Sequence, residues 1–277
     1  MKLTIRGVSE EVGSRPMVMG ILNVTDDSFY DGGRYADPSR AVDRGVAMCE
    51  DGADIVDIGG ESTRPGADPV SAKDEIEKVV PLVSALAERI DVPISVDTYK
   101  AEVAREAIVA GARIINDISA LRFDEKMVEV AADAGVPVVL MHMQGTPRDM
   151  QKNPSYNNAV KEIAGFLRER VEFAVSRGVA RDAAIVDPGI GFGKTTEHNL
   201  EILSGIASFH AIGCPVLVGP SRKSFIGNVL NLPVEERLEG TAAAVAVAVM
   251  NGADIVRVHD VKEMVRVVKL TGAIAAA

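Results

Sequence analysis

Short apolar segments recur along the whole chain. Eight of them are rich in β-branched residues and lack the alternation of polar and apolar side chains that marks a strand with one solvated face. Unbroken apolarity over a few residues is typical of strands buried on both faces of a parallel sheet. The sequence therefore predicts eight strands, at residues 17–24, 55–58, 94–96, 113–116, 138–141, 184–186, 216–218 and 254–258.

The segments between these strands carry apolar residues at helical spacing, as in residues 41–49 and 76–86. Glycine follows four of them, at Gly52, Gly111, Gly135 and Gly252, shortly before the next predicted strand. Glycine tolerates the left-handed conformation that ends many helices, so strand and helix are predicted to alternate.

Eight strand–helix units favour a closed barrel over an open sheet. The chain has 277 residues, and one such barrel typically occupies about 250. We therefore predict an α/β fold with a single (β/α)8 TIM barrel, forming one domain over residues 1–277. Residues 2–6 are predicted as a short N-terminal extension, a strand at the bottom of the barrel.

Composition and charge exclude several classes of protein. Hydrophobic residues make up 47% and charged residues 25%, as in a globular protein with a sizeable core. A formal charge of -10 disfavours nucleic acid and anionic membranes as partners. Residues 1–20 lack the pattern of a secretory signal, and the longest apolar run, 242–250, is too short to span a bilayer. The two cysteines, Cys49 and Cys214, lack metal-site spacing, so we expect reduced thiols and a cytoplasmic protein.

Polar residues close nearly every predicted strand, at the barrel end where such folds place their chemistry. The series is Asn23, Asp57, Asp97, Asn116, His142, Asp187, the Ser221-Arg222-Lys223 segment, and Arg257 with His259.

Four of these residues, Asp97, Asn116, Asp187 and Lys223, would converge on one cavity from different strands. Carboxylates accept adjacent N–H groups, an ammonium donates to an oxygen, and an amide does both. That combination suits a flat heterocycle with a 2-amino-4-oxopyrimidine edge. Any one of the four would equally well serve as a strand-end cap or ion pair, and the argument depends on their number.

Arg257 and His259 stand two positions apart, so on a strand both point to one side, where they would grip a phosphate. Asn23 offers a neutral oxygen that could join phosphate oxygens around Mg²⁺, an ion that seldom has an all-protein cage. The glycine-rich loop at 187–194 is a weak phosphate signal, and its Phe192 would serve either a ligand or the core. Met141 and His142 could line the same cavity. Segments 25–33 and 61–68 are expected to be mobile loops over the barrel mouth.

With these residues in view, the sequence resembles the dihydropteroate synthase family over essentially its whole length. The motifs that carry the resemblance occur in the family's order. They are GILNVT (20–25), DIGGESTRPG (57–66), SVDT (95–98), INDI (115–118), LMHMQG (140–145), DPGIGFGK (187–194), SRKSFIG (221–227) and RVHDV (257–261).

The resemblance implies three subsites and a magnesium cofactor held at Asn23. The pterin site would comprise Asp97, Asn116, Met141, Asp187 and Lys223. The diphosphate site would comprise Asn23, Arg257 and His259. The site for 4-aminobenzoate would comprise Thr63, Arg64, Pro65, Phe192, Lys223 and Ser224.

The implied reaction joins 6-hydroxymethyl-7,8-dihydropterin diphosphate to 4-aminobenzoate and releases pyrophosphate, through an SN1-like loss of the leaving group assisted by Mg²⁺. Asp97, Lys223, Arg257 and His259 would be its catalytic residues. The resemblance also implies a homodimer formed through helices around 242–250 and 261–270, although apolar helix faces equally cover a barrel.

Three alternative functions call for different residues. A pterin-binding methyltransferase domain would not need the phosphate grip of Arg257 and His259, and a non-catalytic relative would be expected to lose some of the principal positions. A phosphosugar isomerase would need a catalytic carboxylate with a histidine partner.

The chain departs from the family at one loop position, where Asp26 replaces the usual proline. Because proline fixes φ, its loss should loosen the loop, and we expect a modest kinetic effect.

Overall fold

A sheet of eight parallel strands forms the centre of the molecule. The computed structural model describes residues 2–5, 8–11, 15–24, 38–64 and 66–277. Neighbouring strands follow the order β8-β7-β6-β5-β4-β3-β10-β9. Their bounds are β3 Met17–Asn23, β4 Ile55–Gly59, β5 Ile94–Asp97, β6 Ile114–Asp117, β7 Val138–Met141, β8 Ala184–Asp187, β9 Leu217–Val218 and β10 Ile255–Val258.

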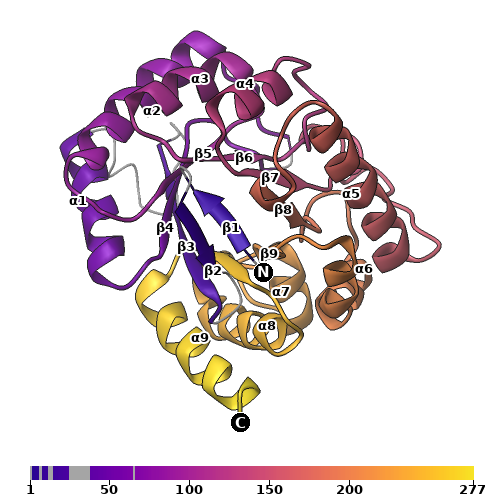
Figure 1. Ribbon diagram of the computed structural model, residues 1–277. Coiled ribbons are helices and arrows are strands. Elements are labelled where there is room, and N and C mark those ends of the chain that lie inside the picture. Colours follow the sequence, from indigo (N-terminus) through magenta and orange to yellow (C-terminus); the bar gives the residue numbers. More distant parts are fainter. Residues whose placement is uncertain (1, 6–7, 12–14, 25–37, 65) are drawn as a thin grey trace.

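The sheet closes on itself between β8 and β9. Val186 of β8 forms a parallel bridge with Val216, and its amide donates to the carbonyl of Pro215 at 2.9 Å. Viewed along the barrel, Figure 1 shows the strands at the centre with the helices arranged around them. The predicted (β/α)8 fold is therefore confirmed.

Helices connect the strands and cover the outside of the barrel. The α-helices are α1 Pro38–Glu50, α2 Ala72–Ala87, α3 Ala101–Ala110, α4 Met127–Ala134, α5 Ala159–Ser176, α6 Thr196–Ser204, α7 Ser224–Leu230, α8 Leu238–Met250 and α9 Val261–Ala275. Short 3-10 helices are η2 Arg181–Ala183, η3 Ile206–Ile212 and η4 Val234–Glu236.

Helix α2 shows how local sequence sets these elements. Ser71 caps it by accepting the backbone N–H of Asp74 at 3.1 Å, which satisfies one of the free donors of the first turn. Val79, Val83 and Leu86 recur at helical spacing and are fully buried. Burying each such side chain stabilises the fold by about 1.5–3 kcal/mol relative to exposing it.

The N-terminal extension is an antiparallel hairpin of β1 Lys2–Ile5 and β2 Val8–Glu11. Strand β1 lies beside η2, which leads into the N-terminal end of β8. Figure 1 shows the hairpin over the middle of the ring. The predicted N-terminal strand is thus present, as one arm of a hairpin at the bottom of the barrel.

An apolar layer fills the barrel itself and is separate from the larger core between strands and helices. Its members come from seven different strands, and all lie at or below 9% exposure. They are Met17, Met19, Ile55, Ile114, Val139, Ile185, Leu217 and Ile255. The barrel is therefore packed rather than open, and only its mouth is left for a ligand.

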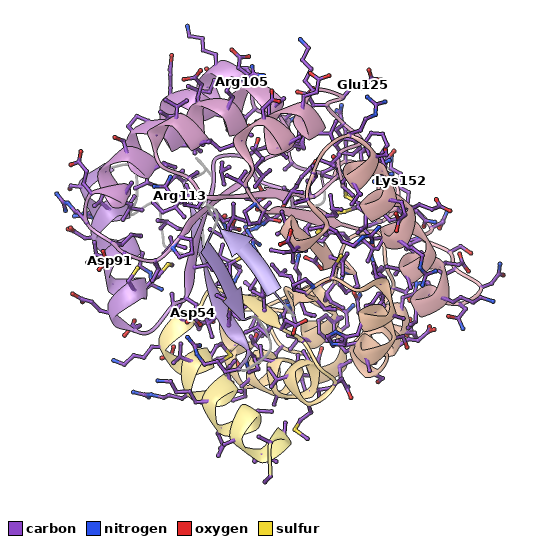
Figure 2. The ribbon with its side chains drawn as sticks, viewed as in Figure 1. Asp54, Asp91, Arg105, Arg113, Glu125 and Lys152 are labelled. Atoms are coloured by element: carbon purple, nitrogen blue, oxygen red, sulfur yellow. The ribbon has the colours of Figure 1, made fainter. Side chains whose placement is uncertain are left out.

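Charged side chains cover much of the outer face of the helical ring. Figure 2 shows Arg105 of α3 at the outer edge of the ring, as expected for a surface in contact with water. Within the described part of the chain, none of the helices combines the length and apolar character needed to cross a bilayer.

Candidate active site

A polar layer lies directly above the apolar layer in the barrel. Side chains two positions apart on a strand point to the same face, so the residues that follow the apolar layer by two also point inward. These residues are Ile21, Asp57, Asn116, Met141, Asp187, Gly219 and Arg257. The alternation of each strand thus delivers charged and amide groups to the barrel mouth.

Arg257 is the centre of this layer. Its Nε donates to Oδ2 of Asp57 at 2.6 Å, and its Nη2 donates to Oδ2 of Asp97 at 2.7 Å. Asn116 Nδ2 donates to the same oxygen of Asp57 at 3.0 Å. One cation therefore joins strands β4, β5 and β10, and Asn116 extends the network to β6.

Burial and pairing act in opposite directions on these charges. Burial raises the pKa of Asp97 to about 7, and the guanidinium of Arg257 works against that rise. Burial alone would lower the pKa of Arg257, but Asp57 and Asp97 outweigh it and raise that pKa. Arginine keeps its charge in proteins, and a 2.7 Å contact favours the carboxylate. Asp97 is therefore largely ionised only above about pH 7 and takes up a proton more readily than a free aspartate.

The glycine-rich loop after β8 brings Asp187 and Phe192 to the mouth. Oδ1 of Asp187 accepts the N–H of Gly189 at 2.7 Å. A Cβ on Gly189 would lie 2.0 Å from the carbonyl oxygen of His142, and φ is +72° there. Only glycine fits such a position. The carboxylate of Asp187 is 5% exposed, and burial raises its pKa to about 6.

Lys223 reaches the same place from the segment that follows β9. Its Nζ lies 3.9 Å from the centre of the Phe192 ring, within the range of a cation–π contact. A Cβ on Gly191 would lie 2.9 Å from Cδ of Lys223, so this glycine makes room for the lysine. Burial lowers the pKa of Lys223 to about 8, and Arg257 adds to the effect. An acid and a base with shifted pKa values in one cavity are typical of functional sites.

His259 lies at the end of β10 beside Ser221. The hydroxyl oxygen of Ser221 accepts the backbone N–H of His259 at 3.2 Å and lies 2.9 Å from Nδ1. The hydroxyl hydrogen can then go to Nδ1, which leaves the proton of a neutral ring on Nε2. Burial, followed by the charge of Arg257, lowers the pKa of His259 to about 3. The ring is neutral at physiological pH and donates one N–H.

A cavity of about 530 Å³ opens above these groups. Most of the residues predicted for the site line it: Asn23, Thr63, Arg64, Asp97, Phe192, Lys223, Ser224, Arg257 and His259. Asn116, Asp187 and Met141 lie deeper and do not line it, since each is at most 5% exposed. His142 is also buried and packs edge-on against Phe166, with ring centres 4.9 Å apart. A hollow of about 600 Å³ between α5 and α6 holds none of the polar layer.

The segment that begins at Glu61 forms one wall of the cavity. Tyr99 donates its hydroxyl to Oε1 of Glu61 at 2.7 Å, and Lys100 binds both Glu61 and the buried Glu75. The backbone N–H of Val70 donates to Oε2 of Glu61 at 3.0 Å. The loop that carries Thr63 and Arg64 is thus fixed at its start by an ion-pair cluster. Pro65 and the whole of the predicted loop at 25–33, which includes Asp26, lie outside the described residues.

Comparison with known proteins decides the family. Residues 19–259 match the family model described as pterin binding enzyme. The dihydropteroate synthase of Escherichia coli K12 is 48% identical over 273 residues, or 99% of this chain and 96% of the relative. The dihydropteroate synthase of Bacillus subtilis 168 is 49% identical, over 94% of this chain and 88% of the relative. The chain belongs to the dihydropteroate synthase family.

Solved structures of the family agree with this fold. A Yersinia pestis dihydropteroate synthase in complex with a sulfonamide drug superposes with a TM-score of 0.95 at 46% identity, over 100% of this chain and 99% of that one. A Xanthomonas albilineans dihydropteroate synthase with 4-aminobenzoic acid gives a TM-score of 0.91 at 42% identity, covering 100% and 98%. Family membership, predicted from the motifs, is confirmed, and it makes the chain a transferase of folate biosynthesis.

Several residues around this dihydropteroate synthase cavity were not among those predicted for the site. Asp57 was recognised as a strand-end residue. Because alternate residues of a strand point to the same side, the sequence could also have placed it beneath Arg257. Met150, Gln151 and Arg237 line the cavity from segments far from any strand end, so strand-based reasoning could not reach them.

Proposed function

We propose that the chain condenses 6-hydroxymethyl-7,8-dihydropterin diphosphate with 4-aminobenzoate to give 7,8-dihydropteroate and pyrophosphate. The single observation that carries the proposal is the meeting of Asp97, Lys223, Arg257 and His259 around one cavity. Carboxylate acceptors, an ammonium donor and a basic pair there match a pterin and a diphosphate at once.

The pterin is assigned to the deep end of the cavity. Carboxylates of Asp97 and Asp187 would accept the N–H groups of its 2-amino-4-oxo edge, Asn116 would add an amide contact, and Lys223 would donate to its oxygen. Met141 would contribute apolar contact, since it belongs to a cluster with Met143, Met150 and Phe192. Entry of a ring at this depth requires Arg257 to loosen its hold on Asp97.

The diphosphate is assigned to Asn23, Arg257 and His259. Arg257 uses two of its five N–H donors on Asp57 and Asp97, so donors remain for phosphate oxygens. Neutral His259 adds one N–H. These donors would stabilise charge on the leaving group as it builds up, which lowers the barrier rather than merely binding the substrate.

The donor set fits magnesium only together with the substrate. No group of three His, Cys, Asp or Glu side chains that could hold a metal occurs among the described residues. Asn23 offers one amide oxygen beside Gly59, and Mg²⁺ commonly takes one or two protein ligands with phosphate oxygens and water. When bound, the ion would neutralise charge on the departing pyrophosphate.

4-Aminobenzoate is assigned to the outer part of the cavity, against Phe192, Lys223, Ser224, Thr63 and Arg64, with Pro65 completing the wall. The C–O bond to the diphosphate breaks first, and its electron pair leaves with pyrophosphate. The amine nitrogen then forms the new C–N bond at the pterin methylene carbon and loses a proton. Sulfonamides, which resemble the arylamine, are proposed to compete for this part of the cavity.

The same reasoning extends to location and assembly. We propose the cytoplasm, where thiols stay reduced, because Cys49 and Cys214 are both free. We propose one domain over residues 1–277 and a homodimer built on α7, α8 and α9. Of the nine exposed large hydrophobic side chains in the described chain, six lie on these helices: Val229, Leu230, Val247, Met250, Leu270 and Ile274.

Pyrophosphate release from the pterin diphosphate tests the proposal. We expect release only when 4-aminobenzoate and Mg²⁺ are both present. Lys223→Ala removes a donor to both substrates and should lower kcat/KM at least about a hundredfold, the upper range for hydrogen bonds to charged groups.

The alternative, a methyltransferase domain that uses methyltetrahydrofolate, predicts a different result. It would bind pterin but release no pyrophosphate under any of these conditions. Arg257 and His259, which line the cavity at the proposed diphosphate position, count against it, because a methyl-folate brings no phosphate for them to bind.

A further inference from the structure

Lys194 is a buried lysine that the proposed mechanism does not use. It is 3% exposed, is the last residue of the glycine-rich loop, and does not line the cavity. Its Nζ lies 2.8 Å from the carbonyl oxygen of Phe192, 3.1 Å from Nδ1 of His142 and 3.3 Å from the carbonyl oxygen of His142. Three acceptors match the three N–H donors of an ammonium group.

Burying a lysine at this position costs free energy, because its ammonium group loses contact with water. Burial lowers its pKa to about 7, against the pull of Asp187. An apolar side chain of similar length would fill the same space without desolvating a charge. The contacts of Nζ therefore indicate that the hydrogen bonds of Lys194 are needed, and not only the volume of its side chain.

The hydrogen bonds of Lys194 hold the backbone on either side of Phe192. Gly191 and Gly193 flank it with φ angles of +82° and +62°, and glycine restrains a backbone less than any other residue. Gln151 Nε2 donates to the carbonyl of Gly191 at 2.9 Å, and Tyr156 donates its hydroxyl to the carbonyl of Gly193 at 2.8 Å. Lys194 holds the carbonyl between these two, and so ties the loop after β8 to the end of β7.

The side chain held in this way is part of the cavity wall. The Phe192 ring is 8% exposed, packs with Met141 and Met150, and meets Nζ of Lys223 at 3.9 Å. A rotation of the Phe192 backbone would move the ring away from Lys223 and change the space offered to a flat aryl ligand.

We propose that Lys194 is a positioning residue, which fixes the Phe192 ring against Lys223 and so shapes the part of the cavity that receives 4-aminobenzoate. The inference rests on the proposed function for the identity of that ligand. Its effect on catalysis passes through Phe192, since Lys194 itself touches no substrate.

Steady-state kinetics of Lys194→Met test the inference. The substitution keeps an unbranched side chain, one heavy atom shorter, and removes the donors. The expected result is a rise of at least about tenfold in KM for 4-aminobenzoate, the equivalent of about 1.4 kcal/mol, with KM for the pterin diphosphate within about threefold. Lys73→Met is the matched control, because that lysine is 83% exposed and should leave both constants unchanged.

A double-mutant cycle separates positioning from general loss of structure. Phe192→Leu is combined with Lys194→Met, and with Lys194→Gln in case the methionine variant does not fold. If Lys194 acts through Phe192, the lysine substitution has little further effect once the ring is gone. Additive effects on KM, or an equal rise in both KM values, would overturn the inference.

The wild-type assay distinguishes this failure from that of the proposed function. Wild-type protein without pyrophosphate release overturns the function. In that case a crystal structure of Lys194→Met decides the positioning role, which holds if the Phe192 ring leaves Lys223 and fails if the ring stays.

Discussion

At the scale of single residues, Asp57 determines where the charge of Arg257 lies. Its side chain is 0% exposed, and one oxygen accepts from both Arg257 and Asn116. Its other oxygen, Oδ1, is buried without a hydrogen-bond partner. A buried carboxylate whose second oxygen has no partner depends on its remaining ion pair, so the guanidinium is held strongly at the base of the cavity.

The pH dependence of kcat/KM for the pterin diphosphate is predicted at this scale. Asp187 accepts N–H groups only when ionised, above its raised pKa of about 6. Lys223 donates as an ammonium only when protonated, below its lowered pKa of about 8. The expected profile is a bell that falls on the acid side near pH 6 and on the alkaline side near pH 8.

Asp187→Asn provides the control for this profile. The substrate's terminal phosphate also titrates near pH 6, and its contribution would persist in the variant. We expect kcat/KM to drop about tenfold to a hundredfold and the acid limb to flatten. An acid limb that survives unchanged would show that Asp97 or the substrate, and not Asp187, produces it.

The strand-end residues of the site were open to prediction from sequence, because a two-residue period fixes which side chains point inward. Asp97, Asp187 and Arg257 each follow an apolar run by that rule. The burial of Lys194 could not be predicted in this way, since a lysine at the end of a glycine-rich loop is ordinarily solvated. Its burial follows from where the end of β7 lies, which depends on contacts distant in sequence.

At the scale of elements, the predicted strands agree with the structure to within one residue at every end. Strand β9 is the instructive case, since residues 216–218 were expected and only Leu217–Val218 pair as a strand. Val216 instead bridges to Val186 and closes the barrel. Closure is a property of the ring, so the local pattern could not separate the two kinds of pairing.

The wall segment around Glu61 gives a prediction at this scale. Tyr99→Phe removes the hydroxyl that donates to Glu61 but keeps the edge-on ring contact with Phe123, at 5.5 Å. The loss of one hydrogen bond to a charged group should lower the free energy of unfolding by about 1.5–3 kcal/mol. Loosening of the loop that carries Thr63 should raise KM for 4-aminobenzoate a few-fold. Urea titration and steady-state kinetics measure the two effects.

Ser176→Ala is the matched control for Tyr99→Phe. It removes a hydroxyl that donates to the carbonyl of Phe173 at 2.7 Å, on the exposed side of α5. We expect little change in stability and none in KM. If Tyr99→Phe behaves in the same way, the ion-pair cluster does not fix the loop.

At the scale of the whole molecule, charge and apolar surface are unevenly spread. The chain carries a formal charge of -10, yet Arg64, Arg222, Lys223, Arg237 and Arg257 all line one cavity. An anionic substrate is thus drawn to a local positive region of an otherwise acidic protein. The exposed apolar side chains of α7, α8 and α9 gather in the C-terminal part of the chain.

Assembly is the prediction that belongs here. Leu270 and Ile274 on α9 are 66% and 58% exposed. If these helices form the dimer interface, Leu270→Lys with Ile274→Lys buries unpaired charge and should weaken association by about 3 kcal/mol, or roughly a hundredfold in Kd. Sedimentation should then show monomers at concentrations where wild type is dimeric.

Val109→Lys is the control for the assembly experiment, because Val109 is 80% exposed on α3, well away from α9 in sequence and in Figure 1. It should leave the dimer intact. A double variant that sediments like wild type would place the interface elsewhere.

The hydrogen bond between Arg257 and Asp97 means that Arg257 competes with the ligand for the carboxylate of Asp97. A guanidinium presents N–H groups around one carbon, and so does the 2-amino edge of a pterin. On the proposed assignment, pterin binding is an exchange in which one guanidine-like group replaces another at the same carboxylate. Because the side chain is tethered, it competes at high effective concentration. An inhibitor that leaves Arg257 in place and extends from it toward Phe192 would escape that competition.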